Sequence, residues 1–397
     1  MKKGIVFFAL GIVSLLAGCG GSGTDGGGPT GGMSKAALGA KLYKDTNLSN
    51  PPGQSCESCH SLQLLAGSNG TARAFADPDS SFDKPVSEGA VTGAFGDRNA
   101  PTAAYAMFSP DFQYDAANGR YIGGQFLDGR AKDLVEQAKG PFLNPKEMNN
   151  TRQGVVEAVR AASYAAAFRS VYGANSLDDV DTAYHHIADA IAAFERTAMF
   201  APFTSKFDAV QAGTASFTDA EQRGFDLFQV NGKGKCAECH KLEKAGGSSG
   251  VLFTDFSYWN IGVPQNPNNP AGTTATGFTD TGLAANPNLS TSAAAERGKF
   301  KVPTLRNVEL TAPYMHNGSL ATLEDVVSFY NTRDPNNCWS DTQTPFVDCW
   351  PDPEAGGNND PLGTTMDVTF TGDLGLTAQD EADLVAFMKT LTDGYAP

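Results

Sequence analysis

Helix signals dominate the hydrophobic pattern of the chain. Residues 218–221, Thr-Asp-Ala-Glu, form a capping box, and Phe225 and Phe228 follow it on one helical face. Near the C-terminus, Thr377 precedes an apolar stripe at helical spacing that consists of Leu384, Phe387, Met388 and Leu391. The pattern therefore predicts a mainly α-helical protein.

Segments of the first half of the chain match segments of the second half. The matching pairs are 39–43 with 224–228, 100–102 with 302–304, and 128–134 with 317–323. The leucine that ends each segment of the third pair is followed, seven residues later, by Pro141 in the first half and by Tyr330 in the second. These matches predict two domains related by an internal repeat, over residues 34–205 and 206–397.

The first residues resemble an export signal. Two lysines precede an apolar run over residues 5–16, which is too short to span a bilayer and leads through Leu-Ala-Gly to Cys19. This ending resembles the lipobox of bacterial lipoproteins, which predicts a signal peptide over residues 1–18 and lipidation of Cys19. A plain signal peptide with a chance cysteine is the alternative. The glycine-rich residues 19–33 are expected to form a flexible tether.

Charge and the residue after Cys19 narrow the choice of partners and compartment. The chain holds 29 Lys and Arg against 44 Asp and Glu, a formal net charge of −15. This balance argues against a nucleic-acid partner and favours basic partners. Because glycine rather than aspartate follows Cys19, we expect an exported protein that is lipid-anchored at the periplasmic face of the outer membrane or at the cell surface.

Two copies of one short motif carry the chemistry of the chain. Cys-x-x-Cys-His occurs at Cys56, Cys59 and His60, and again at Cys236, Cys239 and His240, 236 − 56 = 180 residues later. Two thiols at this spacing bond the vinyl groups of a haem, and the adjacent imidazole binds the iron from one face. Zinc binding and thiol redox chemistry are the alternatives for such cysteine pairs. The histidine in both copies and the export signal favour two covalent c-type haems. The two domains are therefore expected to be cytochrome c-like, each with one covalent haem.

The opposite face of each haem is expected to differ between the two halves. Pro141 offers no donor atom to iron, whereas the phenol oxygen of Tyr330 can bind ferric haem. No histidine occurs between residues 61 and 184, so none of that stretch can close the first site. Tyr330 could instead be a core aromatic residue, and the rival ligands of the second haem are Met315, Met366 and Met388.

Two cysteines remain outside these motifs. Cys338 and Cys349 lie within residues 331–375, a long segment rich in Pro, Asn, Gly and Asp. Because thiols of exported proteins oxidise, this pair is expected to form a disulfide that stabilises the fold by about 3 kcal/mol. The segment is either a docking surface for a partner or a stapled surface loop.

Several stretches of the chain resemble the bacterial dihaem cytochrome c peroxidases and MauG. They are 98–102 (Arg-Asn-Ala-Pro-Thr), 125–130 (Gln-Phe-Leu-Asp-Gly-Arg), 136–141 (Glu-Gln-Ala-Lys-Gly-Pro), 147–148 (Glu-Met), 301–307 (Lys-Val-Pro-Thr-Leu-Arg-Asn) and 314–318 (Tyr-Met-His-Asn-Gly). The resemblance covers the chain from about residue 38 to residue 391. It implies a peroxide site at the N-terminal haem and electron entry at the C-terminal haem.

The resemblance implies roles for individual residues near the first haem. Gln137, Pro141 and Glu147 match the distal pocket, and they are the candidate catalytic residues. The Glu147 carboxyl group could move a proton between the two oxygens of hydrogen peroxide, and the Gln137 amide could hydrogen-bond the bound oxygen. Arg306 matches a haem-binding position within the quoted motifs.

The resemblance also implies a calcium ion between the two domains. Asn99, Thr311 and Pro313 match the family positions that bind calcium through a side-chain oxygen and two backbone carbonyl oxygens. Hard oxygen donors of this kind suit calcium. His316 matches a histidine beside the second haem, which is structural or lies on the path of the electron rather than binding iron.

Two residues depart from the pattern of the well-known peroxidases. Those enzymes carry a methionine ligand where this chain has Tyr330, and here the sequence is similar to MauG, whose second haem has a tyrosine ligand. An anionic oxygen ligand stabilises the higher oxidation states of iron and lowers its reduction potential. Leu127 stands where the family usually has a tryptophan between the haems, which argues against charge hopping through an aromatic bridge.

Together these features predict a haem peroxidase of the cytochrome-c peroxidase type. It would reduce hydrogen peroxide to water at the first haem with electrons passed through the second, and its donor would be a small redox protein, either a cytochrome c or a copper protein. One alternative is a MauG-like enzyme that uses peroxide to oxidise side chains of a partner protein. Another is a non-catalytic, membrane-anchored electron-transfer cytochrome. The resemblance also allows a homodimer.

Overall fold

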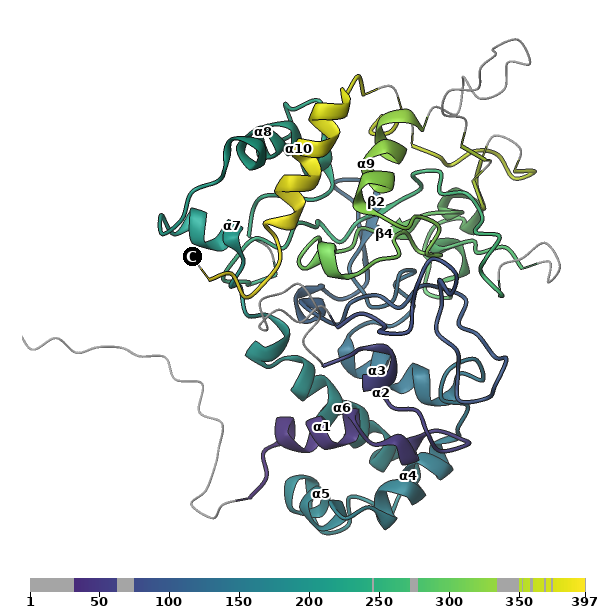
Figure 1. Ribbon diagram of the computed structural model, residues 1–397. Helices are drawn as coiled ribbons and strands as arrows, with labels where there is room; N and C mark the ends of the chain where they lie inside the picture. The colour runs from purple at the N-terminus through teal and green to yellow at the C-terminus, as the bar shows by residue number, and fades with distance from the viewer. Residues whose placement is uncertain are drawn as a thin grey trace, which may run out of the picture. The chain divides into compact units, whose positions relative to one another are not determined.

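The computed structural model describes residues 32–62, 75–244, 246–271, 278–333, 350–351, 353–357, 360–367, 369–372 and 374–396. Within these residues the chain is mainly helical, which confirms the predicted fold class (Figure 1). The α-helices are α1 (Lys35–Tyr43), α2 (Cys56–Cys59), α3 (Leu134–Leu143), α4 (Arg152–Ala161), α5 (Ala165–Tyr172), α6 (Val180–Glu195), α7 (Lys206–Gln211), α8 (Asp219–Phe228), α9 (Leu323–Thr332) and α10 (Ala378–Lys389). Short 3-10 helices are η1 (Thr46–Leu48), η2 (Ala106–Phe108), η3 (Ala198–Phe200), η4 (Cys236–Glu238), η5 (Leu283–Ala285), η6 (Ala293–Glu296) and η7 (Val308–Leu310).

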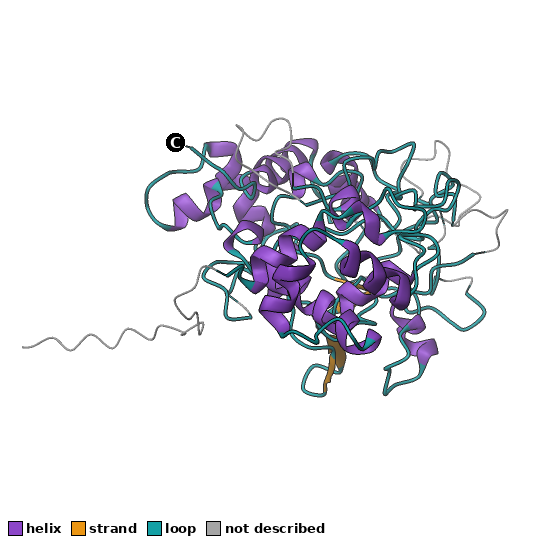
Figure 2. Cartoon of the chain, turned by 90° about the horizontal axis from the view of Figure 1, so that it is seen from below, coloured by secondary structure: helices purple, strands orange, loops and turns teal. Residues whose placement is uncertain are grey.

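Strands make up a small part of the described chain, as Figure 2 shows. β1 (Gln113–Asp115) pairs antiparallel with β2 (Arg120–Ile122), and β3 (Tyr258–Trp259) pairs antiparallel with β4 (Phe300–Lys301). An isolated bridge connects Ile122 to Ser257, so the two ribbons lie close to each other. Tyr121 of β2 and Tyr258 of β3 pack with Leu283 in a small hydrophobic cluster of their own.

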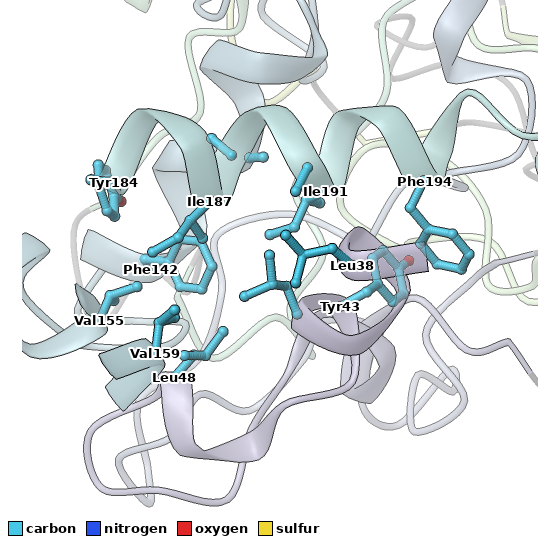
Figure 3. Packing of buried hydrophobic residues seen from close by; sticks show 14 of the residues in the cluster. Leu38, Tyr43, Leu48, Phe142, Val155, Val159, Tyr184, Ile187, Ile191 and Phe194 are labelled. Atoms are coloured by element: carbon cyan, nitrogen blue, oxygen red, sulfur yellow. The ribbon is translucent and has the colours of Figure 1, made fainter. Parts of the chain in front are cut away.

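The contact of α1 with α6 organises the core of the first half. Figure 3 shows side chains of this core, among them Leu38, Tyr43, Ile191 and Phe194. The two helices approach closely because Gly39 has no side chain: a Cβ atom there would lie 1.9 Å from the carbonyl oxygen of Ala190. Only glycine fits where two backbones approach each other this closely.

The contact of α8 with α10 repeats this arrangement in the second half. A Cβ atom at Gly224 would lie 1.9 Å from the carbonyl oxygen of Asp383. Both helices begin where the sequence predicts, because the side chains of Thr218 and Thr377 cap them within complete capping boxes. Figure 1 shows α8 and α10 side by side.

Alanine at either helix-contact glycine is expected to destabilise the protein. In Gly39→Ala and Gly224→Ala the added methyl group meets rigid backbone, so the helices must separate at a cost of about 1–3 kcal/mol. Gly96→Ala is the matched control, because its methyl group would have no neighbour closer than 3.7 Å. Urea unfolding of the holoprotein measures the difference, and equal stability of all three variants would contradict the close contact.

α3 and α9 occupy corresponding places in the two halves. Asp133 caps α3 and Thr322 caps α9, and each helix follows a glycine with positive φ, Gly129 at 69° and Gly318 at 65°. Pro141 is the eighth residue of α3, and Tyr330 is the eighth residue of α9. Both residues therefore take the same position within their helix, and the internal repeat that would make them equivalent stays a prediction.

The described part of the long segment after α9 packs back on the second half. The Asn260 side-chain amide donates to the carbonyl oxygen of Ala355 at 3.0 Å, and Arg297 forms an ion pair with Asp360 at 2.5 Å. The predicted disulfide of Cys338 and Cys349 lies outside the described residues. The described part of this segment therefore packs against the second half and does not project freely from it.

Residues 1–31, with the expected signal peptide and Cys19, also lie outside the described residues. In the described part of the chain, no helix combines the length and the apolar character needed to cross a membrane. The anchor at Cys19 therefore stays a prediction from the sequence.

Candidate haem sites

The first Cys-x-x-Cys-His motif forms one short helix. α2 begins after Ser55, whose backbone N–H donates to the Ser58 hydroxyl oxygen at 3.1 Å. The N–H of His60 donates to the carbonyl oxygen of Cys56 at 2.8 Å. The two cysteines and the histidine thus lie on a single turn, from which all three can reach one flat macrocycle.

The second motif has the same local geometry. Cys236 begins η4, and the N–H of His240 donates to the Cys236 carbonyl oxygen at 2.9 Å. In each motif the histidine Nδ1 contacts the carbonyl oxygen of a phenylalanine, Phe75 at 3.3 Å from His60 and Phe253 at 2.8 Å from His240. Both phenylalanines have a φ of 53°, which turns their carbonyl groups toward the imidazoles.

These contacts select the form of each imidazole. A carbonyl oxygen only accepts hydrogen bonds, so Nδ1 of His60 and of His240 carries the proton and Nε2 keeps its lone pair. Burial lowers the pKa of both histidines, which disfavours the imidazolium form. A neutral imidazole that presents Nε2 is the form that binds iron, so both residues fit the predicted role.

The four thiols of the motifs are poor thiolates. Burial raises the pKa of Cys59, Cys236 and Cys239 to about 12, and it raises the pKa of Cys56 as well. Thiol redox sites depend on a lowered thiol pKa. The burial of these cysteines therefore disfavours the redox alternative and suits permanent bonding to a cofactor.

A cavity of about 340 Å³ lies beside the second motif. Its wall is mostly apolar and includes Cys236, Cys239, His240, Tyr330, Leu384 and Met388. An apolar cradle with two thiols and one imidazole on its wall fits a covalently attached haem.

Tyr330 reaches this cavity from α9. Burial raises the pKa of Tyr330, and negative charge on Cys239 and Cys236 raises it further. A buried phenol stays protonated unless a nearby cation stabilises the phenolate, and a ferric iron would supply that charge. Of the rival ligands, Met315 and Met388 line the same cavity, whereas the sulfur of Met366 packs against Gly262. Ligation by Tyr330 stays a prediction.

The predicted distal residues of the first site lie on α3 and the turn after it. Gln137 is one helical turn before Pro141, and Glu147 follows in the next turn, where the N–H of Met148 donates to the Pro141 carbonyl oxygen at 3.2 Å. Burial is the main cause that raises the pKa of the two cysteines of the first motif, and the charge of Glu147 adds to it. The structure thus brings Glu147 near the first motif, while its catalytic role stays a prediction.

The Glu147 carboxyl group is held and desolvated. Asn144 Nδ2 donates to Glu147 Oε1 at 2.7 Å. Burial raises the pKa of Glu147, the Asn144 hydrogen bond and the charge of Arg130 lower it, and Asp97 raises it, with a net upward shift. A carboxyl group shifted upward is suited to accept and return a proton near neutral pH.

Comparison with known proteins identifies the family. The family model for di-haem cytochrome c peroxidase matches residues 33–216. The chain is 39% identical over 362 residues to the methylamine utilization protein MauG of Paracoccus denitrificans, covering 90% of this chain and 88% of that protein. It is 35% identical to the cytochrome c551 peroxidase of Nitrosomonas europaea, covering 74% of this chain and 71% of that protein. The chain belongs to the di-haem cytochrome c peroxidase family.

A solved structure agrees with this assignment. The crystal structure of the diheme peroxidase BthA from Burkholderia thailandensis matches with a TM-score of 0.72 and 32% identity, covering 90% of this chain and 86% of that chain. As a member of the di-haem cytochrome c peroxidase family, the protein is a haem oxidoreductase with two haems. The family accounts for both Cys-x-x-Cys-His motifs and for the cavity beside the second.

The residues that match the calcium site of the di-haem peroxidase family lie round the same cavity. Asn99, Thr311 and Pro313 all contribute to its wall. The N–H of Asn99 donates to the carbonyl oxygen of His316 at 2.8 Å, which joins the two segments. Leu127, the residue that departs from the tryptophan of the family pattern, also lines the cavity. Calcium binding stays a prediction.

Arg306, the predicted haem-binding arginine, is fully buried, with 0% exposure. Its guanidinium group donates to both carboxylate oxygens of Asp208, at 2.5 and 2.8 Å, and its Nε donates to the Val251 carbonyl oxygen at 2.8 Å. It also lies 5.5 Å from the ring centre of Phe253, whose carbonyl group orients His240. Through these contacts Arg306 stabilises the backbone around Phe253, which orients His240 of the second motif. A direct contact of Arg306 with the haem stays a prediction.

Loss of the Asp208 charge is expected to destabilise the fold strongly. Asp208→Asn leaves the buried Arg306 without its counter-charge, which costs about 3–5 kcal/mol. Asp181→Asn, which removes an exposed partner of Arg152, should cost at most about 1 kcal/mol. Urea unfolding of the holoprotein checks both values, and similar stability of the two variants would contradict a buried pair.

The same pair gives stability a defined pH dependence. Burial alone would raise the pKa of Asp208, but Arg306 and Ser205 outweigh burial and lower it. A carboxyl group with a lowered folded-state pKa contributes stability that is present above its unfolded pKa, near 4, and is lost as pH falls through the folded value. Asp208→Asn should therefore flatten the acid limb of the stability profile.

Sequence reasoning missed several residues on the cavity wall. Lys301 is one of them: its Nζ donates to the Gly124 carbonyl oxygen at 2.6 Å, and burial lowers its pKa to about 8. Glu354 is another, and its Oε2 lies 3.1 Å from Nε2 of His316. The position of Lys301 in the strand before the Val-Pro-Thr segment was the one available signal. Nothing in the local sequence marks Glu354.

Proposed function

We propose that this member of the di-haem cytochrome c peroxidase family reduces hydrogen peroxide to water at the first haem, with electrons passed through the second. The observation that carries the proposal is the contrast between Pro141 and Tyr330 at the same eighth position of α3 and α9. Proline offers no ligand atom, so peroxide can bind there, whereas the tyrosine oxygen can close the second haem. The two halves, 34–205 and 206–397, are then two copies of one haem-binding unit.

The chain's own residues move the protons of this reaction. A bound haem supplies the electrons that split the O–O bond. Glu147 would accept a proton from one oxygen of hydrogen peroxide and return it to the other, which leaves as water. Gln137 would donate an amide hydrogen bond to the remaining oxygen. Asn144 holds the Glu147 carboxyl group in place through Oε1.

The proposal also covers the electron donor and the cellular location of the enzyme. The donor is a small redox protein, a cytochrome c or a copper protein, that docks near the second haem. Export and lipidation at Cys19 place the enzyme at the periplasmic face of the outer membrane or at the cell surface. Asn99, Thr311 and Pro313 hold one calcium ion beside the second cavity. Association into a homodimer is part of the same family expectation.

A second candidate function rests on Tyr330. If the second haem is bound by an anionic oxygen, it stores oxidising equivalents well and accepts electrons poorly. Peroxide-derived oxidising power would then be used on side chains of a partner protein, as the similarity to MauG of Paracoccus denitrificans suggests. The location of Tyr330 on the cavity wall beside Cys236 and Cys239 favours this candidate.

Spectroscopy of the purified ferric holoprotein tests the peroxidase proposal. Mass spectrometry should find two covalent haems, and electron paramagnetic resonance should find one high-spin and one low-spin centre. One equivalent of hydrogen peroxide should change the high-spin signal. Two low-spin centres and no response to peroxide would overturn the proposal.

The fate of the oxidised enzyme separates the two candidates. Rapid steady-state turnover with a reduced small cytochrome or copper protein supports the peroxidase. A two-electron-oxidised state that persists in the presence of these donors supports modification of a partner protein. The measurement is stopped-flow absorbance after mixing with one equivalent of peroxide.

A further inference from the structure

The packing of α6 on α1 and of α10 on α8 defines a residue-by-residue correspondence. Gly39 meets Ala190 and Phe194 of α6, and Gly224 meets Asp383 and Phe387 of α10 with nearly the same distances. The correspondence therefore pairs Phe194 with Phe387. One residue further on, it pairs Glu195 with Met388.

This correspondence locates Glu195 relative to the first haem. In the second half, Leu384 and Met388 share one face of α10 and line the cavity beside the second motif. Their counterparts on α6 are Ile191 and Glu195, which also lie four residues apart. Figure 3 shows Ile191 on the face of α6 turned toward α1 and the core. Glu195 thus stands where an apolar haem-contacting residue stands in the second half.

The Glu195 side chain has the properties of a group that lacks its partner. The residue is 8% exposed, and its Oε2 has no hydrogen-bond partner among the described residues. An orphaned buried carboxyl oxygen is costly and needs a specific explanation. Burial and then the charge of Glu195 raise the pKa of both Tyr43 and Cys56, so this carboxyl group lies close to the first motif.

Among the described residues, three titratable or charged groups interact with Glu195. Its charge acts on Tyr43 of α1 and on Cys56 of α2, and the charge of Arg196, the next residue in the chain, acts on Glu195. Burial raises the pKa of Glu195 to about 8, and the positive charge of Arg196 opposes this shift. Thioether formation with a haem removes the ionisable thiol of Cys56. The positive charge of Arg196 is unaffected by this bond.

We propose that Glu195 contacts the first haem and takes up one proton when that haem gains one electron. The inference rests on the proposed function, because it needs a haem at Cys56 and Cys59. An external reductant gives one electron to the ferric iron, which becomes ferrous, and water gives one proton to the Glu195 carboxylate. No bond to iron forms or breaks, and the net charge of the buried site stays the same.

The physical reason is the low dielectric around the pair. An added electron on a buried haem and a negative carboxylate repel strongly when water is excluded, and protonation of the carboxylate removes the repulsion. In the second half, Met388 occupies the corresponding position and cannot take up a proton. The role of Glu195 is therefore to balance the charge of the first haem, and it is not a catalytic residue.

Spectroelectrochemical titration of the full-length holoprotein from about pH 6 to about pH 10 tests this inference. We expect the reduction potential of the first haem to fall as pH rises through a window around 8. The fall should correspond to a tenfold decrease in the equilibrium constant of reduction per pH unit, which means one proton per electron. Glu195→Gln and Glu195→Met should abolish this slope in that window. Neither substitution should change the pH dependence of the second haem, whose cavity wall carries Lys301.

Two carboxylate variants serve as controls. Glu157→Gln removes an exposed carboxyl group of α4 and should leave the slope unchanged. Glu136→Gln removes an exposed carboxyl group of α3 and should also keep the slope. An unchanged slope in Glu195→Gln with both haems attached would overturn the role of Glu195 alone. Absence of covalent haem at Cys56 and Cys59 would overturn the proposed function as well.

Wild-type protein provides a measurement that does not depend on the folding of any variant. The infrared difference spectrum of the wild-type protein between the ferrous and ferric first haem should gain a protonated-carboxyl band on reduction. If no such band appears, Glu195 does not take up the proton.

Discussion

Replacing Glu147 by glutamine is expected to slow the reaction of the ferric protein with hydrogen peroxide by about 10²–10⁴-fold. The amide keeps the size of the side chain and can still contact Asn144, but it cannot accept the peroxide proton. Both haems should remain attached, because Glu147 touches neither motif covalently. Stopped-flow absorbance at the haem bands measures the rate constant.

Glu136→Gln is the matched control for this variant. Glu136 is an exposed residue of α3 that pairs with Lys139, so its loss should leave the rate within about twofold of wild type. A rate for Glu147→Gln equal to that of the control would show that another group moves the proton.

The pH dependence of the wild-type reaction has a predicted sign. The carboxylate form of Glu147 accepts the proton, so the rate should rise as pH increases through the pKa of this group. Because burial raises that pKa above the ordinary value of about 4.5, the rise should lie on the neutral side of an exposed glutamate. Glu147→Gln should lose this inflection while any later one remains.

The parts of the fold that the sequence predicted are those encoded by local signals. The capping box at Thr218 and the cap at Thr377 predicted the starts of α8 and α10, and both starts are confirmed. The counting that paired Pro141 with Tyr330 agrees with their place as eighth residue of α3 and of α9, because a cap and a positive-φ glycine precede both helices. Short-range rules of this kind need no knowledge of tertiary contacts.

The remaining features depend on contacts between distant residues. Asp208 pairs with Arg306 across 98 positions of the chain, and no local pattern distinguishes this aspartate from an exposed one. The carbonyl groups of Phe75 and Phe253 orient the histidines only because both residues adopt positive φ, which is unexpected for phenylalanine. Tertiary packing imposes these conformations, so the sequence alone could not predict them.

Glu195 illustrates the same limit at the first haem. It ends an apolar stripe of α6 as a single acidic residue beside Arg196, which is typical of a solvent-exposed helix end. Only the packing of α6 on α1 through Gly39 turns it inward. The comparison of α6 with α10 then assigns it to the haem-facing side.

Replacing Tyr330 by methionine is expected to raise the reduction potential of the second haem substantially, within the roughly 0.8 V range that axial ligands span. A neutral sulfur ligand stabilises ferrous iron, whereas a phenolate stabilises the ferric and higher states. Tyr330→Phe, which removes the donor atom but keeps the ring, should convert the second haem to a high-spin form. Potentiometric titration and electron paramagnetic resonance measure the two effects.

Control variants on the same cavity wall separate Tyr330 from its rivals. Tyr314→Phe removes a phenol that donates to the Val308 carbonyl oxygen at 3.0 Å, and it should leave both spectrum and potential unchanged. Met315→Leu and Met388→Leu should also be spectroscopically silent. A low-spin signal that survives Tyr330→Phe and disappears in either methionine variant would assign the ligand to that methionine.

The Tyr330→Met variant also distinguishes between the two candidate functions. If Tyr330 binds the second haem, that haem should be a weak acceptor, so electrons from a small cytochrome should arrive slowly and the peroxide-oxidised enzyme should persist. Raising the potential in Tyr330→Met should increase steady-state turnover with a reduced cytochrome and shorten the lifetime of the oxidised state. If turnover and lifetime stay constant while the potential rises, electron entry at the second haem does not limit the reaction, and the donor must reach the first haem by another path.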